Sequence, residues 1–148
     1  MQVRDYMTTK VTTLSDDARL LDAALLIRRT GKRHVPIVDG EGKVVGIISD
    51  RDVSRMAPSM LAKMTPEEYN AVFESTPITV AMTRNPIVVS PETPIKEAVA
   101  ILYSKKIGAL LAVESGKLVG ILTVSDMLGL LNELLAGEGP SEGETTTV

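Results

Sequence analysis

Several residue types that carry chemistry are absent or rare in this 148-residue chain. It has no cysteine and no tryptophan, one phenylalanine, three tyrosines and one histidine. Without cysteine, disulfides, thiolate metal sites and thiol nucleophiles are excluded. Because aromatic residues are scarce, the core must be built from aliphatic side chains, which favours strands and helices in an α/β packing.

Long hydrophobic runs are also missing. No apolar segment approaches the roughly 18–20 residues that a membrane span needs, and the first seven residues lack the apolar core of a signal peptide. The formal net charge of −3 gives no overall attraction to nucleic acid. We therefore expect a cytoplasmic protein, with neither a membrane nor nucleic acid as its partner.

The sequence contains one pattern twice. Residues 44–53 are Val-Val-Gly-Ile-Ile-Ser-Asp-Arg-Asp-Val, and residues 118–127 are Leu-Val-Gly-Ile-Leu-Thr-Val-Ser-Asp-Met. Each copy is an apolar run with a glycine inside it, followed by a hydroxyl residue and, three places later, an aspartate. Two such copies predict two similar folding units and two similar sites.

The repeat extends well beyond this pattern. Met7 recurs 75 positions later as Met82, whereas Asp52 recurs 74 positions later as Asp126. The single lost residue falls in a Gly-rich turn, at 39–43 in the first copy, where a hairpin tolerates a change of length.

Hydrophobic periodicity predicts the same element order, β-α-β-β-α, in both copies. Apolar residues spaced i, i+3, i+4 and i+7 predict an amphipathic helix, and alternating apolar runs around the turn predict a hairpin. The predicted segments are strands at 11–14, 34–38 and 44–48 with helices from about 20 and 50, then strands at 87–89, 109–113 and 118–122 with helices from about 95 and 124.

This repeat divides the chain into four parts. We expect a first repeat at 1–57, a connector at 58–77, a second repeat at 78–136 and a disordered tail at 137–148. Within the connector, Thr65 followed by Pro66 indicates the start of one helix, because proline is favoured at the first helical position.

The order of these motifs resembles a tandem pair of cystathionine-β-synthase-type (CBS) domains, the arrangement called a Bateman module. The resemblance rests on Met-Thr before each first strand, on Arg-His-Val-Pro-Ile-Val at 33–38, and on the doubled Gly–hydroxyl–Asp pattern; it covers about residues 1–135. The connector also resembles that of small stand-alone pairs of the acetoin-utilisation type.

The resemblance implies a fold in which tandem β-α-β-β-α repeats pack with pseudo-twofold symmetry and leave two clefts between them. It implies a sensor that binds AMP, ADP, ATP or S-adenosylmethionine, forms a homodimer and regulates a protein supplied by a separate chain. It implies no enzyme, no catalytic residue, no metal and no required cofactor. The ligand-binding positions implied are Thr12, His34, Val35, Pro36, Ser49, Arg51, Asp52, Ala109, Leu110, Thr123 and Asp126.

The doubled hydroxyl–aspartate pattern has a purely structural alternative. Ser49 with Asp52, and Thr123 with Asp126, match the capping box that satisfies the free N–H groups of a helix start. The same helix start is also a ready anion site, and a carboxylate can accept both hydroxyls of a ribose. By resemblance the aspartates hold ribose, and capping is compatible with that role.

Two residues distinguish the first copy from the second. Arg51 has Ser125 as its counterpart, so it either binds phosphate or is a solvated arginine paired with Asp50 or Asp52. His34 has no Cys or acidic cluster beside it, which argues against a metal site; it either lines the ligand pocket or only begins a strand.

Two rival functions remain at the level of sequence. The first is a dimerisation or protein-interaction module whose clefts hold no ligand. The second is an enzyme, which the sequence disfavours because it offers carboxylates at helix starts and no further catalytic constellation.

Overall fold

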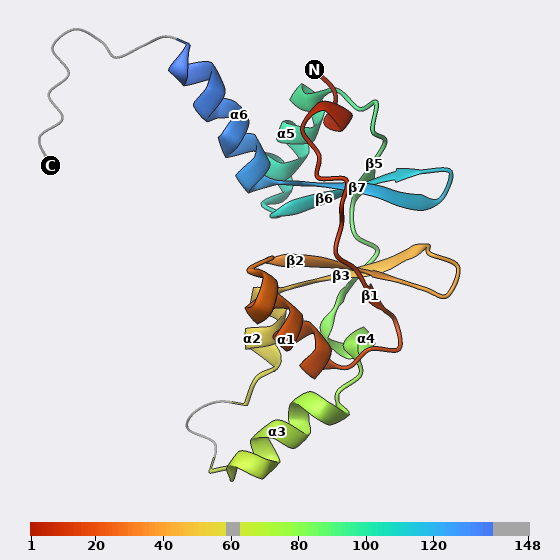
Figure 1. Ribbon diagram of the computed structural model, residues 1–148, viewed down its shortest axis with the longest axis vertical. Helices are drawn as coiled ribbons and strands as arrows, with labels where there is room; N and C mark the ends of the chain where they lie inside the picture. Colours follow the sequence, from red (N-terminus) through yellow and green to blue (C-terminus); the bar gives the residue numbers. More distant parts are fainter. Residues whose placement is uncertain (59–62, 138–148) are drawn as a thin grey trace, which may run out of the picture.

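The computed structural model describes residues 1–58 and 63–137, which form two similar units stacked along the long axis of the molecule (Figure 1). One unit contains a four-stranded sheet of order β1-β2-β3-β4, and the other a three-stranded sheet of order β5-β6-β7. The predicted α+β fold is therefore confirmed. Except for Gly137, the predicted tail lies outside the described residues.

The first unit has the β-α-β-β-α order that the periodicity predicts. Strand β1 pairs in parallel with β2, and β2 pairs antiparallel with β3 across a turn that the Asp39 carboxylate holds by accepting two backbone N–H groups. The elements are β1 (Leu14–Ser15), α1 (Leu20–Thr30), β2 (His34–Val38), β3 (Val44–Ser49) and α2 (Asp50–Met56).

The second unit repeats this order with a longer final helix. Its first strand again pairs in parallel with the second, and the hairpin again pairs antiparallel. The elements are β5 (Val88–Val89), α5 (Ile95–Lys105), β6 (Ala109–Glu114), β7 (Lys117–Thr123) and α6 (Val124–Ala136).

The N-terminal segment of the chain packs in the second unit. The N–H of Val3, in the 3-10 helix η1 (Val3–Asp5), donates to the carbonyl of Thr93 at 2.8 Å, and Thr8 pairs with Ile121 of β7. Figure 1 shows this segment crossing from the first unit to reach α5. Residues 1–8 therefore belong structurally to the second unit.

A matching segment crosses in the opposite direction. Helix α4 (Ile78–Ala81) buries Ile78 in the first core, and β4 (Thr83–Arg84) pairs antiparallel with β3. Residues 73–84 therefore belong structurally to the first unit. A division of the chain at residues 57 and 78 describes the sequence repeat but does not separate the two cores.

A methionine and a glycine mark each crossing. A Cβ at Gly120 would overlap the sulfur of Met7, and a Cβ at Gly46 would overlap the sulfur of Met82. Each methionine thus lies over a glycine of the opposite half of the sequence, which explains why both glycines sit inside strands. This reciprocal contact is the most direct sign of pseudo-twofold symmetry.

Three aliphatic clusters hold the molecule together. One fills each unit, and a third joins the two sheets through Ala109, Leu111 and Ile121, with Val44 and Ile47 packed against them. The sheets therefore face each other across apolar contacts, and this placement brings the starts of β2 and β6 to the boundary between the units.

The connector contains helix α3 (Pro66–Ser75), as the Thr-Pro pattern predicts. The Thr65 hydroxyl accepts the N–H of Glu68 at 3.1 Å, and Pro66 occupies the first helical position. Phe73 is buried in the first core. The connector therefore packs on the first unit rather than only linking the two repeats.

Candidate ligand-binding site

The first candidate site lies where β3 passes into α2. The Asp52 carboxylate accepts the N–H of Ser49 at 2.8 Å and its hydroxyl at 3.0 Å, while the Asp52 N–H donates to the Ser49 hydroxyl oxygen at 3.2 Å. Ser49 is extended, with φ −116°, as an N-cap residue should be. The predicted capping box is therefore present.

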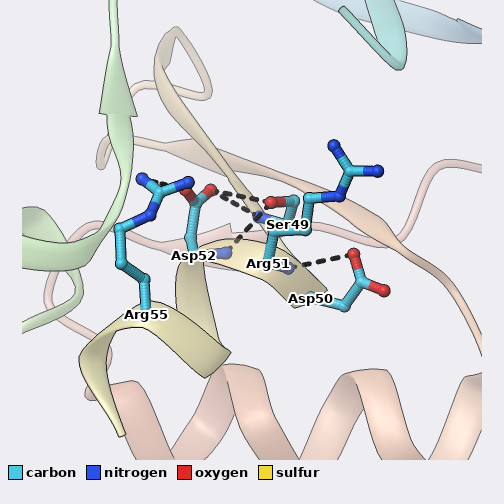
Figure 2. Close-up of polar contacts among 5 residues, drawn as sticks. All are labelled: Ser49, Asp50, Arg51, Asp52 and Arg55. Atoms are coloured by element: carbon cyan, nitrogen blue, oxygen red, sulfur yellow. Dashed lines mark hydrogen bonds and ion pairs between the residues drawn. The ribbon is translucent and has the colours of Figure 1, made fainter.

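The cation beside Asp52 is Arg55 rather than Arg51. Nη1 of Arg55, one helical turn after Asp52, lies 3.5 Å from Oδ1 of the Asp52 carboxylate. The Arg51 side chain extends away from that carboxylate (Figure 2). Arg51 is exposed, and only its backbone N–H contacts Asp50, at 3.0 Å. Arg51 forms no ion pair with either aspartate within residues 1–58 and 63–137. Its guanidinium is therefore exposed to solvent and to any anion that approaches.

The role of Arg55 was not predicted from the sequence. Its i, i+3 spacing from Asp52 was the available signal, since such pairs share a helix face. Asp52 is the one buried charged side chain among the described residues, with 8% exposure, and the Ser49 and Arg55 contacts compensate its burial.

The second candidate site repeats the cap without the arginine. The Asp126 carboxylate accepts the N–H of Thr123 at 2.8 Å through Oδ2, and the Asp126 N–H donates to the Thr123 hydroxyl at 3.2 Å. At the position equivalent to Arg55 the chain has Gly129. Within the described residues no side chain pairs with Oδ1 of Asp126, so this carboxylate is the more available one.

His34 reaches across the boundary between the units. It begins β2 in register with Ser49, and its imidazole lies so close to Gly108 that a Cβ there would overlap Nε2. The second repeat has Ala109 at the equivalent position, which cannot make this contact. The histidine is therefore more than a strand-end residue, since it joins the two halves.

Burial is the main influence on the titration of His34. It lowers the pKa of His34 from the ordinary value of 6.5, against the opposing effect of the Asp50 and Asp52 carboxylates. The nearby Arg33 and Arg51 also lower it. The imidazole therefore favours its neutral form at neutral pH.

The structure also locates the remaining predicted residues. Val35, Pro36 and Leu110 have buried side chains, and Ala109 belongs to the cluster between the sheets, so only their backbone is available to a ligand. Thr12 is half-buried in the extended segment before β1.

The two hydroxyl–aspartate pairs lie at equivalent strand-to-helix junctions, Ser49–Asp52 after β3 and Thr123–Asp126 after β7. Asp50 N–H donates to the Arg33 carbonyl and Val124 N–H to the Gly108 carbonyl, both at 3.0 Å, so the junctions are built alike. Of two surface grooves, one of about 600 Å³ lies along α5 and α6 and includes Val124 of the second junction, and one of about 500 Å³ lies along α1, away from both junctions. No group of His, Asp and Glu suited to a metal occurs among the described residues.

The family model for the CBS domain matches this chain twice, at residues 3–58 and 74–133. The chain belongs to the CBS-domain family. The predicted tandem pair is thus confirmed. Both matches include a capped junction, and the second begins inside α3, close to where the chain crosses into the first core.

Relatives of two kinds match this chain over most of its length. A CBS domain-containing protein of Dictyostelium discoideum is 27% identical over 134 residues, which cover 90% of this chain and 92% of the relative. The A-adding tRNA nucleotidyltransferase of Aquifex aeolicus is 31% identical over 133 residues, but the chain spans only 15% of that enzyme. The chain thus matches nearly the whole of one relative and a small part of the other.

Solved structures share the fold over nearly the whole chain. An acetoin utilization protein (AcuB) from Vibrio cholerae is 34% identical, with a TM-score of 0.77, and the alignment covers 96% of this chain and 98% of that one. At 24% identity, CBSX2 in complex with AMP has a TM-score of 0.75, and the CBS pair of protein MJ0100 in complex with 5-methylthioadenosine and S-adenosyl-L-methionine has 0.74; each covers 90% of this chain and 98% of the other.

The described helices give no sign of a membrane span. None of them within residues 1–58 and 63–137 is both long enough and apolar enough to cross a bilayer.

Proposed function

We propose that this CBS pair is a regulatory module that binds an adenosine ligand at its two strand-to-helix junctions. AMP, ADP and ATP are the first candidates, and S-adenosylmethionine is a further one. Support comes from the related folds solved with AMP and with S-adenosyl-L-methionine. Regulation, rather than catalysis, is the role inferred for the pair.

The observation that carries the proposal is the doubled capping carboxylate. Asp52 and Asp126 occupy equivalent positions, and each uses one carboxylate oxygen, Oδ2, to hold the backbone of its own helix start. A carboxylate fixed in this way can present its second oxygen to the hydroxyls of a ribose. Charge-assisted hydrogen bonds of this kind contribute about 1.5–3 kcal/mol each.

The two junctions offer different chemistry. Asp126 has its Oδ1 unengaged within the described residues, so a sugar can approach it without displacing a protein group. At the first junction Arg55 already contacts Asp52, but the exposed guanidinium of Arg51 is free for a phosphate. The first site is therefore assigned a phosphorylated ligand, and the second site a ligand held mainly through its ribose.

Occupancy of the sites is proposed to alter the relative position of the units and thereby to signal to a regulated protein on another chain. A ligand achieves this only when its affinity differs between the two arrangements. The His34–Gly108 contact at the boundary is one contact that such a shift would change. A homodimer in the cytoplasm is the proposed working form.

Calorimetry with a matched pair of variants tests the proposal. Asp126→Ala should weaken AMP or ATP binding at the second site at least tenfold, because a charged hydrogen-bond acceptor is lost. Asp22→Ala is the control: the Asp22 carboxylate likewise accepts the backbone N–H of the N-cap residue, Arg19, at 2.8 Å, but at the start of α1. Both variants should lose similar stability, and only the first should lose affinity.

Mass spectrometry of gently purified protein gives an independent answer, since a retained nucleotide would be released on denaturation. No retained ligand, together with no heat from AMP, ADP, ATP or S-adenosylmethionine, would contradict the sensor function. That outcome would favour the interaction module, in which the capping boxes are purely structural.

A further inference from the structure

Arg55 makes the two junctions differ at the oxygen atom that a ribose would use. Oδ2 of Asp52 holds the Ser49 backbone, and Nη1 of Arg55 lies 3.5 Å from Oδ1, so both carboxylate oxygens have a protein partner (Figure 2). At the second junction Oδ2 of Asp126 holds Thr123 in the same way. Its Oδ1 forms no hydrogen bond or ion pair with the described residues. Only the second junction therefore has an open carboxylate oxygen.

The sequence repeat explains why this oxygen is open. Gly129 stands three residues after Asp126, where the first unit has Arg55. A Cβ at Gly129 would meet no atom within 4 Å, so the second unit has room for a side chain there but lacks one. Accordingly, Asp126 is half-buried, whereas Asp52 is buried, with 8% exposure. The contact of Arg55 is thus a property of one residue and not of the fold.

We propose that Arg55 competes with the ribose of a bound ligand for Asp52, so that the second junction fills at a lower ligand concentration than the first. The inference rests on the proposed function, in which both aspartates accept hydrogen bonds from ribose. A guanidinium N–H and a ribose hydroxyl are both donors, and at the first junction they need the same oxygen, Oδ1. Binding there includes the cost of breaking the Arg55 contact, and binding at the second junction does not.

The competition is weak enough for a ligand to displace the arginine. The Arg55 side chain is 74% exposed, and an ion pair with so exposed a partner contributes at most about a factor of five to an equilibrium constant. The guanidinium can leave Asp52 for solvent while the Ser49 cap, which uses the other oxygen, stays in place. Arg55 therefore raises the ligand concentration that fills the first junction without closing that junction.

A phosphate on the ligand narrows the difference between the junctions. Arg51 is exposed and has Ser125 as its counterpart, so of these two positions only the first junction offers a guanidinium to a phosphate. Charge-assisted hydrogen bonds from Arg51 offset the loss of the Arg55 contact. Ordered filling is therefore strongest for a ligand without phosphate, and adenosine is the probe that isolates the effect of Arg55.

Calorimetry with adenosine tests the competition at the first junction. Asp126→Ala weakens binding at the second junction, so the heat that remains reports on the first. In that background Arg55→Ala should raise the affinity for adenosine about fivefold, because the competing donor is gone. Arg29→Ala is the control and should leave the affinity unchanged, since it removes an equal charge from an exposed position on α1, beside the groove that lies away from both junctions.

The reciprocal exchange tests the second junction. Gly129→Arg places an arginine three residues after Asp126, where the structure has room for it, and should weaken the tighter adenosine site about fivefold. The circular dichroism spectrum should stay unchanged. Gly129→Ala, which removes the glycine without adding a charge, should leave the affinity as it is in the wild-type protein.

Two results would overturn the competition while binding by the wild-type protein stays intact. An unchanged affinity for adenosine in Arg55→Ala, together with weaker binding of AMP, would make Arg55 a phosphate contact instead of a competitor. A second site that Gly129→Arg leaves unaffected would show that an arginine at this position does not reach the carboxylate. Failure of the proposed function is a separate result, in which the wild-type protein binds neither adenosine nor AMP, and it removes the basis of the competition as well.

Discussion

Arg51 is the clearest difference in charge between the two junctions, because Ser125 takes its place in the second. Its guanidinium points away from Asp52 (Figure 2), so removing it should leave the helix start intact. We expect Arg51→Ala to weaken AMP binding about tenfold and adenosine binding hardly at all, since only AMP offers a phosphate. Titration calorimetry with both ligands measures this difference. Equal losses for the two ligands would assign Arg51 a structural role.

His34 should make the stability of the protein sensitive to pH. Its pKa is lower in the folded state than the ordinary 6.5, so the unfolded chain binds the proton more readily. The contribution of neutral His34 is therefore complete well above pH 6.5 and declines as the pH falls below it. The free energy of unfolding should drop between about pH 7.5 and pH 5.5, and His34→Gln should drop less. Urea unfolding of both proteins at the two pH values checks this. An equal drop in the free energy of unfolding for wild type and His34→Gln would show that other groups dominate the pH dependence.

At the level of elements, the two strand glycines are equivalent in sequence but not in surroundings. The three atoms nearest to a Cβ at Gly120 all belong to the flexible side chain of Met7, whereas a Cβ at Gly46 would also lie 3.0 Å from the Thr83 carbonyl oxygen. Gly46→Ala should therefore lower the free energy of unfolding by about 1–3 kcal/mol, the usual range for overpacking, and Gly120→Ala should lower it distinctly less. The denaturant midpoints of the two variants show which substitution lowers stability more. A larger loss at Gly120 would show that the methionine is the more rigid neighbour.

Elements with a strong local pattern were predicted well from the sequence. The hairpin strands and the starts of α2 and α6 lie within a residue of their predicted bounds, because alternation, a Gly-rich turn and a Ser or Thr cap define them locally. The caps of η1 and α1 were missed, since Gln2 and Arg19 are not usual N-cap residues. For β4 and α4, long-range contacts decide the conformation, and segments of two and four residues are too short to give a periodic signal.

In the candidate site too, the contacts between residues close in sequence were predicted and the long-range contact was not. The Ser49–Asp52 and Thr123–Asp126 caps follow from local spacing and were predicted with their partners. The approach of His34 to Gly108 joins positions 74 residues apart, and only the packing of the two sheets brings them together. No local pattern in the sequence carries that information.

For the whole molecule, the exchange of segments makes the two units depend on each other. Val3 is fully buried in the second core although it begins the first repeat. Val3→Ala should therefore cost about 1–3 kcal/mol and lower the unfolding midpoint of both units together. Hydrogen exchange of amides in both units measures this, with Val80→Ala, at a residue 63% exposed, as the control. A midpoint that falls in the second unit alone would show that the units unfold independently.

The crossing segments also affect how the chain folds during its synthesis. Residues 1–8 are synthesised before the rest of the pair, yet their partner strand β7 is the last strand of the described residues. The first unit likewise lacks Ile78 and β4 until its own repeat has long been made. Contacts so distant in sequence slow folding, because the intervening chain must be ordered first. A nascent chain that stops before residue 84 therefore exposes apolar surface of the first unit, whose core is still incomplete.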